Sequence, residues 1–345
     1  MTFIRFGLDI AKRVFQVHGV NQAGSICTRR TLKRNQVLQY FAQIGPCVIG
    51  IEACAGAHYW GRELTKLGHT VRLMAAQFVS PYRKNGKNDA NDAEAICEAV
   101  GRPNMRFVAV KSEEQQSVLM WHRARSLAVT SRTAQVNQIR GLLGEFGFVV
   151  PQGISVLRNR LPDILEDAEN GLPAMARQIL NDLLDQLRAL DERIDGYDVQ
   201  IAELAKSTEA TRRLMELDGV GPITATAMVA AVGDARVFRS GRQFAAWLGL
   251  TPRQNSSGGK SRLGRITKRG DAYLRTLLIH GARALLCFVG RKSDPKSLWA
   301  NRLLQRRHRN VAAVALAAKQ ARIIWAMLAR GSEYQPSMAG SRAMP

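Results

Sequence analysis

The chain has 345 residues, 46% of them hydrophobic, which is enough for two or three domains with separate cores. It carries 50 Lys and Arg against 28 Asp and Glu, a formal charge of +22, and the excess is uneven: +10 in residues 1–150, −6 in residues 151–205 and +18 in residues 206–345. A positive excess this large and this local favours a nucleic-acid partner. An anionic membrane is the second choice, and surface charge that only keeps the protein soluble explains the excess less well.

The cysteines and the apolar stretches indicate the cellular compartment in which the protein works. Five cysteines are scattered without a Cys-x-x-Cys pair, which indicates a reducing compartment and argues against zinc. Asp9 stands where a signal peptide needs an apolar run. The most apolar stretch, residues 311–328, is interrupted by Lys319 and Arg322 and is typical of a buried or amphipathic helix. We therefore expect a cytoplasmic protein, nucleoid-associated when on DNA, with no membrane partner.

The first hundred residues alternate between strand-like and helix-like patterns. The predicted strands are residues 3–9, 14–20, 26–32, 47–52 and 70–74, and the predicted helices are residues 35–44 and 59–67. Three strands followed by alternating helices and strands predict an α/β domain, in which helices pack on a mixed sheet.

Four acidic residues lie at the ends of these predicted elements. Asp9 and Glu52 end two strands, and Asp89 and Asp92 open a helix on which their spacing of three places them on one face. A dication such as Mg2+ needs several oxygen ligands, and carboxylates at strand ends converge on one sheet edge. The alternative is that the two helical acids merely cap the helix and complement its dipole.

Residues 81–88, just before the paired aspartates, form a basic segment that contains a glycine. Arg83, Lys84 and Lys87 are candidates for contacts with phosphates, and Tyr82 for stacking on a base. An ordinary solvated loop is the equal alternative.

The middle of the chain is predicted to be helical. After a helix at residues 112–146, apolar residues recur at alternating intervals of three and four, the seam of a coiled coil. This seam must be buried against the preceding helix or against a second subunit, in which case the coil makes a dimer or tetramer. The seam residues are Leu180, Leu183, Leu187, Leu190, Ile194, Tyr197, Ile201 and Leu204.

Gly219 and Gly221 lie between a helix end and a helix of small residues. This pattern matches the turn of a helix-hairpin-helix element, whose bare backbone N–H groups approach phosphates regardless of sequence. Glycines also end ordinary helices, so the functional interpretation depends on the basic surroundings.

Residues 249–271 form a glycine-rich loop with two serines, Ser256 and Ser257, directly before Gly258. The loop can simply cradle phosphates, or one serine can attack a phosphodiester if a metal or base lowers its pKa. Both roles stay open on the residues alone. The basic side chains of the loop are Arg253, Lys260, Arg262, Arg265, Lys268 and Arg269.

Motifs along the chain resemble, in the right order, those of the DEDD-type insertion-sequence transposases, relatives of the Piv and MooV DNA invertases. The resemblance covers about residues 3–330. The motifs are Gly-Leu-Asp-Ile-Ala-Lys at 7–12, Ile-Glu-Ala at 51–53, Lys-Asn-Asp-Ala-Asn-Asp-Ala at 87–93, Leu-Asp-Gly-Val-Gly-Pro at 217–222, and Ser-Ser-Gly-Gly-Lys at 256–260 with Thr-Lys-Arg-Gly-Asp at 267–271.

This resemblance implies a RuvC-like, ribonuclease H-type domain whose Asp9, Glu52, Asp89 and Asp92 bind Mg2+. We assign residues 1–110 to it. We expect a helical coiled-coil region at 111–210, a mainly α-helical transposase domain at 211–330, and a disordered tail at 331–345.

The resemblance also implies that the Ser-Gly motif supplies a nucleophile, which falls on Ser257, with Ser256 as second choice. It further implies donor and target DNA as partners, together with a structured guide RNA from the element itself. Two alternatives stay open: a metal-dependent nuclease of the junction-resolvase kind that uses water, and a nonenzymatic nucleic-acid-binding protein.

Overall fold

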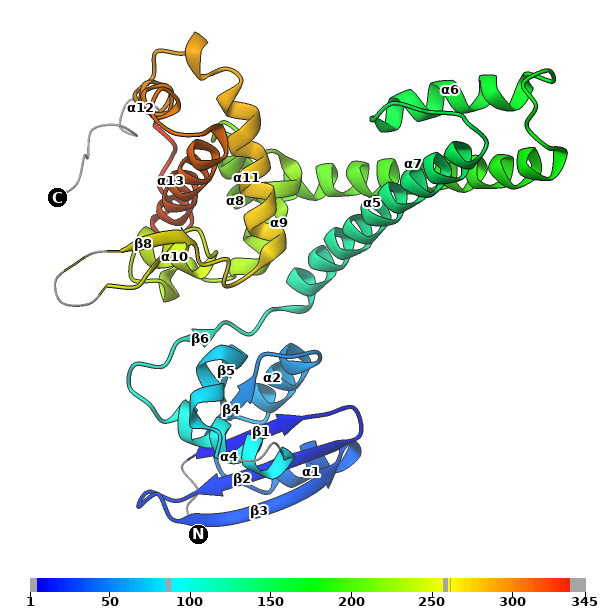
Figure 1. The fold of residues 1–345 in the computed structure, drawn as a ribbon. Coiled ribbons are helices and arrows are strands. Elements are labelled where there is room, and N and C mark those ends of the chain that lie inside the picture. The colour runs from blue at the N-terminus through cyan, green and yellow to red at the C-terminus, as the bar shows by residue number, and fades with distance from the viewer. Residues whose placement is uncertain (1–4, 85–87, 257–259, 261, 336–345) are drawn as a thin grey trace. The chain divides into compact units, whose positions relative to one another are not determined.

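A computed structural model describes residues 5–84, 88–256, 260 and 262–335 (Figure 1). The chain divides into two compact units, an N-terminal unit of residues 1–115 and a C-terminal unit of residues 116–345. The predicted helical middle region and the transposase domain thus share the second unit. Most of the predicted tail, residues 331–345, lies outside the described residues.

The N-terminal unit is built on a six-stranded mixed sheet with the strand order β3-β2-β1-β4-β5-β6. β1 pairs antiparallel with β2 and parallel with β4, and β5 runs parallel to β4. The mixed sheet predicted from the sequence is confirmed, and its first five strands match the predicted ones within two residues. The strands are β1 (Arg5–Ile10), β2 (Val14–Val20), β3 (Ile26–Lys33), β4 (Val48–Glu52), β5 (Thr70–Met74) and β6 (Phe107–Val108).

The two faces of the sheet are set by the alternation of side chains along β1. Phe6 and Leu8 are fully buried in one core with residues of α1 and α2. Gly7 faces the other way, toward α4, where an added Cβ would lie 2.0 Å from the carbonyl oxygen of Ala93. Asp9 therefore emerges on the α4 side of the sheet. The helical segments of this unit are η1 (Arg34–Gln36), α1 (Val37–Ala42), α2 (Ala57–Lys66), α3 (Ala76–Val79), η2 (Ser80–Tyr82) and α4 (Asp89–Val100).

Two long helices, α5 (Glu113–Glu145) and α7 (Ala174–Ser207), pair antiparallel along the middle of the chain. The ring centroids of Trp121 and Tyr197 lie 5.8 Å apart, and Arg132 Nη1 lies 3.1 Å from Asp191 Oδ1. The seam predicted from the heptad pattern thus packs against the preceding helix of the same chain. At the far end, α6 (Ile154–Glu166) completes the core of this helical hairpin.

The remaining helices form a separate core around α13. By length and hydropathy alone α13 is able to cross a membrane, but it packs in this core, with Leu316 and Ile324 buried, and bears Lys319 and Arg322. These elements are α8 (Glu209–Met215), α9 (Pro222–Val232), η3 (Ala235–Val237), α10 (Gly241–Trp247), β7 (Pro252–Gln254), β8 (Leu263–Ile266), α11 (Ala272–Leu286), η4 (Val289–Arg291), α12 (Pro295–Leu304) and α13 (Arg309–Arg330).

A buried histidine joins the helical hairpin to this core. His122 of α5 is 1% exposed, with Nδ1 3.0 Å from the hydroxyl of Tyr273 and Nε2 3.0 Å from Oγ1 of Thr226. Burial lowers its pKa from 6.5 to about 4, so the imidazole is neutral in the folded protein.

Acid is therefore expected to loosen the C-terminal unit through His122. The folded pKa lies below the unfolded one, so its contribution is complete above pH 6.5 and is lost as the pH falls toward 4, by about 3 kcal/mol in all. Urea unfolding of His122→Gln, which does not titrate, should show a shallower fall over this range. Parallel curves for the two proteins would contradict this.

Candidate metal centre and basic surfaces

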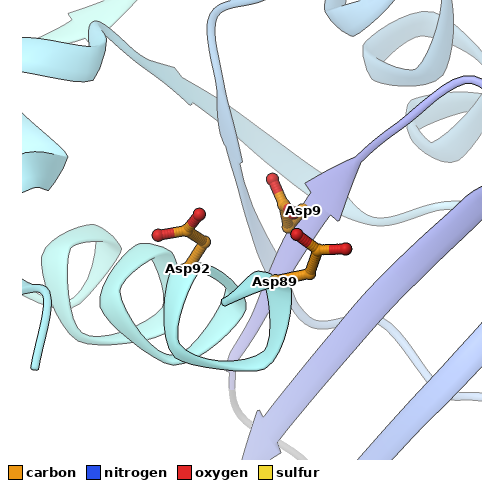
Figure 2. Close-up of side chains that lie close together, drawn as sticks. All are labelled: Asp9, Asp89 and Asp92. Atoms are coloured by element: carbon orange, nitrogen blue, oxygen red, sulfur yellow. The ribbon is translucent and has the colours of Figure 1, made fainter. Parts of the chain in front are cut away.

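Three carboxylates meet at the carboxyl end of β1 (Figure 2). Asp9 comes from the strand, and Asp89 and Asp92 come from the first turn of α4. One oxygen atom of each lies within 4.8 Å of one atom of each of the others. Such spacing allows a single divalent cation to be shared by all three residues.

The cap of α4 is Asn88, whose Oδ1 accepts a hydrogen bond of 2.8 Å from the backbone N–H of Asn91. Neither Asp89 nor Asp92 is the capping residue, so capping does not explain them, although both lie in the first turn, where their charge complements the helix dipole. Sequence reasoning missed this role of Asn88. The signal was present, since asparagine is a preferred cap and stands directly before the first aspartate.

Burial together with crowding of negative charge raises the pKa of Asp9 to about 6. Burial is the largest cause, followed by repulsion from Asp92, Asp89 and Glu52. In an ionised state these groups destabilise one another, and a bound dication removes that repulsion. The oxygen-only donor set and the crowded charge therefore fit a hard divalent ion.

Glu52 lies beside the three aspartates rather than among them. It ends β4, which pairs parallel with β1, so both strands bring their acids to the same sheet edge. Arg83 bridges the two groups: its Nε lies 2.7 Å from Asp92 Oδ1, and its Nη2 lies 3.6 Å from Glu52 Oε2. The Arg83 guanidinium is thus the counter-ion of Asp92 and Glu52 in this structure.

The other candidates for nucleic-acid contacts in residues 81–88 have partners of their own or lie outside the described residues. Lys84 forms an ion pair with Glu94 on α4. The guanidinium carbon of Arg102 lies over the ring of Tyr82, 5.5 Å from the ring centroid. Lys87 lies outside the described residues. In this structure Arg83 and Lys84 are therefore engaged with acids rather than free for phosphates.

A second basic surface lies on the β7–β8 hairpin of the C-terminal unit. Ser257 lies outside the described residues, whereas the Oγ of Ser256 accepts hydrogen bonds from the backbone N–H of Arg262 and from Gln254 Nε2, both 3.1 Å. The six cations predicted from the loop are all exposed and have no carboxylate partner in the described part of the chain: Arg253, Lys260, Arg262, Arg265, Lys268 and Arg269.

The two glycines between α8 and α9 have different surroundings. Gly219 adopts φ +82°, and an added Cβ would lie 2.9 Å from both Gly281 O and Gln320 Nε2, so this glycine serves packing inside the unit. Gly221 is exposed and faces open space at the first turn of α9. Of the two, Gly221 is the more exposed and has space around it for a ligand.

A sheet of the ribonuclease H-like type with carboxylates gathered at its edge defines the class of nucleic-acid phosphoryl-transfer enzymes. Two family models match the chain: a DEDD transposase model of the IS110 type over residues 6–147, and the model "Transposase IS116/IS110/IS902 family" over residues 211–295. The chain belongs to this IS110/IS116/IS902 family of transposases.

Relatives in several bacteria match nearly the whole chain. It is 53% identical to a "Probable family 20 transposase" of Pseudomonas aeruginosa, over 97% of this chain and 100% of that protein. It is 45% identical to the "Transposase for insertion sequence element IS1111A" of Coxiella burnetii, over 95% and 90%. It is 39% identical to the corresponding protein of IS1328 from Yersinia enterocolitica, over 95% and 97%.

Proposed function

We propose that this transposase cuts and rejoins the DNA of an insertion sequence at a Mg2+ centre formed by Asp9, Asp89, Asp92 and Glu52, with Ser257 as the nucleophile. One observation supports the metal centre above all: three carboxylate oxygens from two separate elements lie within 4.8 Å of one another. Such an enzyme works on DNA in the cytoplasm.

The four acids would hold the divalent ion, and Arg83 offsets part of their negative charge. When bound, the divalent ion would stabilise negative charge on the scissile phosphate. Arg83 now neutralises Asp92 and Glu52. A dication held by these carboxylates would take over that neutralisation and would leave the guanidinium available to contact a phosphate oxygen.

The proposed serine step conserves the energy of the phosphodiester. Ser257 Oγ attacks phosphorus and loses its proton, the bond from phosphorus to the 3′ oxygen breaks, and that oxygen takes up a proton as a free 3′-hydroxyl. The resulting phosphoserine ester supports rejoining without an external energy source. Ser256 has a role within the hairpin, since it accepts the backbone N–H of Arg262, and this favours its neighbour as nucleophile.

The resemblance to the wider family supports two further elements of the proposal. A structured RNA from the element pairs with donor and target DNA, and the exposed cations of the β7–β8 hairpin suit either polyanion. Strand exchange needs several active sites, hence two or four subunits. Because α5 covers the seam of α7, contacts between subunits must use other faces of the hairpin, where Met120, Leu127 and Val199 are exposed.

A denaturing gel tests the serine step directly. With labelled element-end DNA, Mg2+ and the guide RNA, the wild-type protein should form an adduct that survives denaturation, and Ser257→Ala should form none. Ser256→Ala is the matched control and should keep the adduct. Cutting that persists in Ser257→Ala would instead favour a nuclease that uses water.

A further inference from the structure

Several basic side chains of the N-terminal unit are already paired with acidic side chains. Arg5, Arg29, Arg62, Lys66 and Arg102 each lie within ion-pair distance of a glutamate. Seven others are exposed and have no carboxylate partner among the described residues. Three of them are arginines that do not line a common hollow, at positions 30, 72 and 106, whereas Lys12, Arg13, Lys33 and Arg34 lie together. Their positive charge is therefore uncompensated within the unit.

These four cations surround one hollow of about 680 Å³, which we call the basic hollow. The loop after β1 and the end of β3 form one wall and are joined by a 2.9 Å hydrogen bond from Arg34 N–H to Arg13 O. Tyr59 and Trp60, in the first turn of α2, form another wall.

The aromatic wall presents an open ring. Tyr59 is 42% exposed, and its ring packs edge-on against Trp60 with the centroids 5.2 Å apart. Trp60 is 3% exposed and lies 5.1 Å from the guanidinium carbon of Arg34. The buried Trp60 thus packs against both Tyr59 and Arg34, while the Tyr59 ring stays accessible to a ligand. Cations around an accessible aromatic ring are the components of a single-strand site, where phosphates meet the charges and a base stacks on the ring.

The basic hollow and the acidic centre share one edge of the sheet. Lys12 and Arg13 lie in the loop that follows β1, just after Asp9, and β3 ends at this edge because β1 and β3 both pair antiparallel with β2. The hollow lies on the side of α1 and α2, and the aspartates lie on the side of α4. A polynucleotide that crosses the edge reaches both.

We infer that the basic hollow binds an unpaired DNA strand next to the phosphate that is cut at the acidic centre. Placing the cut phosphate there rests on the proposed function, but binding in the hollow does not. The ligand is single-stranded because a duplex hides its base faces from Tyr59, whereas an unpaired base can stack on the ring.

Fluorescence anisotropy with the full-length protein in EDTA tests this without any cutting. The probes are a short labelled oligothymidylate, an oligouridylate of equal length and a duplex. Lys12→Gln/Lys33→Gln should weaken oligothymidylate binding and lower its salt slope by about 1.4, or about 0.7 for each phosphate that is no longer neutralised. The matched control, Lys66→Gln/Arg106→Gln, removes the same charge elsewhere in the unit and should leave the slope closer to that of the wild type.

The aromatic part of the inference has its own variants. Tyr59→Ala should weaken oligothymidylate binding about tenfold, and Tyr59→Phe, which keeps the ring, should restore it. Duplex binding should change little in either variant. The inference is overturned if both charge doubles behave alike, if Tyr59→Ala binds as the wild type does, or if only the oligouridylate responds. A wild-type protein that gave these binding results but did not cut DNA would instead count against the proposed function alone.

Discussion

Replacing Asp9 by Asn is expected to abolish strand cutting, by about a thousandfold or more, while DNA binding persists. The amide keeps the shape of the side chain but removes one of three charges that converge within 4.8 Å. Cutting of element-end DNA measures the loss, and anisotropy measures the retained binding. Glu63→Gln is the matched control, because Glu63 pairs with Lys66 on α2 and should leave the rate unchanged.

The same variant should be more stable than the wild type in the absence of metal. The pKa of folded Asp9, about 6, lies above its ordinary 3.8, so the stability linked to its proton is present below pH 3.8 and lost as the pH rises through 6. At pH 7, Asp9→Asn should therefore gain about 1–2 kcal/mol after allowance for solvent screening. A variant that cuts at the wild-type rate, or loses stability, would contradict the proposed centre.

Gly7→Ala is expected to destroy the centre without touching an acid. An added Cβ would lie 2.0 Å from Ala93 O and 2.4 Å from Cys97 N, both backbone atoms of α4 that have no room to yield. The helix must move away from β1, which should cost about 3 kcal/mol or more and separate Asp89 and Asp92 from Asp9. Thermal unfolding measures the first effect, and terbium luminescence as a metal probe measures the second.

Gly45→Ala is the control for this experiment. A Cβ at Gly45 would meet open space, so the substitution should leave both unfolding and terbium binding close to the wild type. If Gly7→Ala behaved like Gly45→Ala, α4 would not be held against β1 as the structure shows.

The sequence predicted the strands and α4 well because these elements carry local signals. Alternating apolar residues mark β1 and β2, and Asp89 and Asp92 mark the start of a helix. The position of Arg83 had no such signal. Its contacts with Asp92 and Glu52 join residues that are far apart in the chain or separated by a turn, and only the folded sheet edge brings them together.

The heptad pattern of α7 illustrates the same limit. Periodicity predicted a seam over several turns but could not name its partner, because a helix of the same chain and a second subunit bury apolar residues equally well. The choice depends on pairs such as Arg125 with Asp198 and Arg132 with Asp191, which fix α5 alongside. Likewise, the sequence assigned no binding role to the cations of the basic hollow, which come from two separate segments, residues 12–13 and residues 33–34.

Because α5 and α7 run antiparallel, the length of the hairpin can change while its two ends keep their contacts with the C-terminal core. The chain leaves the C-terminal core near His122, which contacts Thr226, and α7 returns to pack against α9 of the same core. Whole heptads removed from both helices together would preserve the pairing of Arg132 with Asp191 or its equivalent while shortening the reach of the tip. Such a change would leave the C-terminal core, with its contact between His122 and Thr226, as it is.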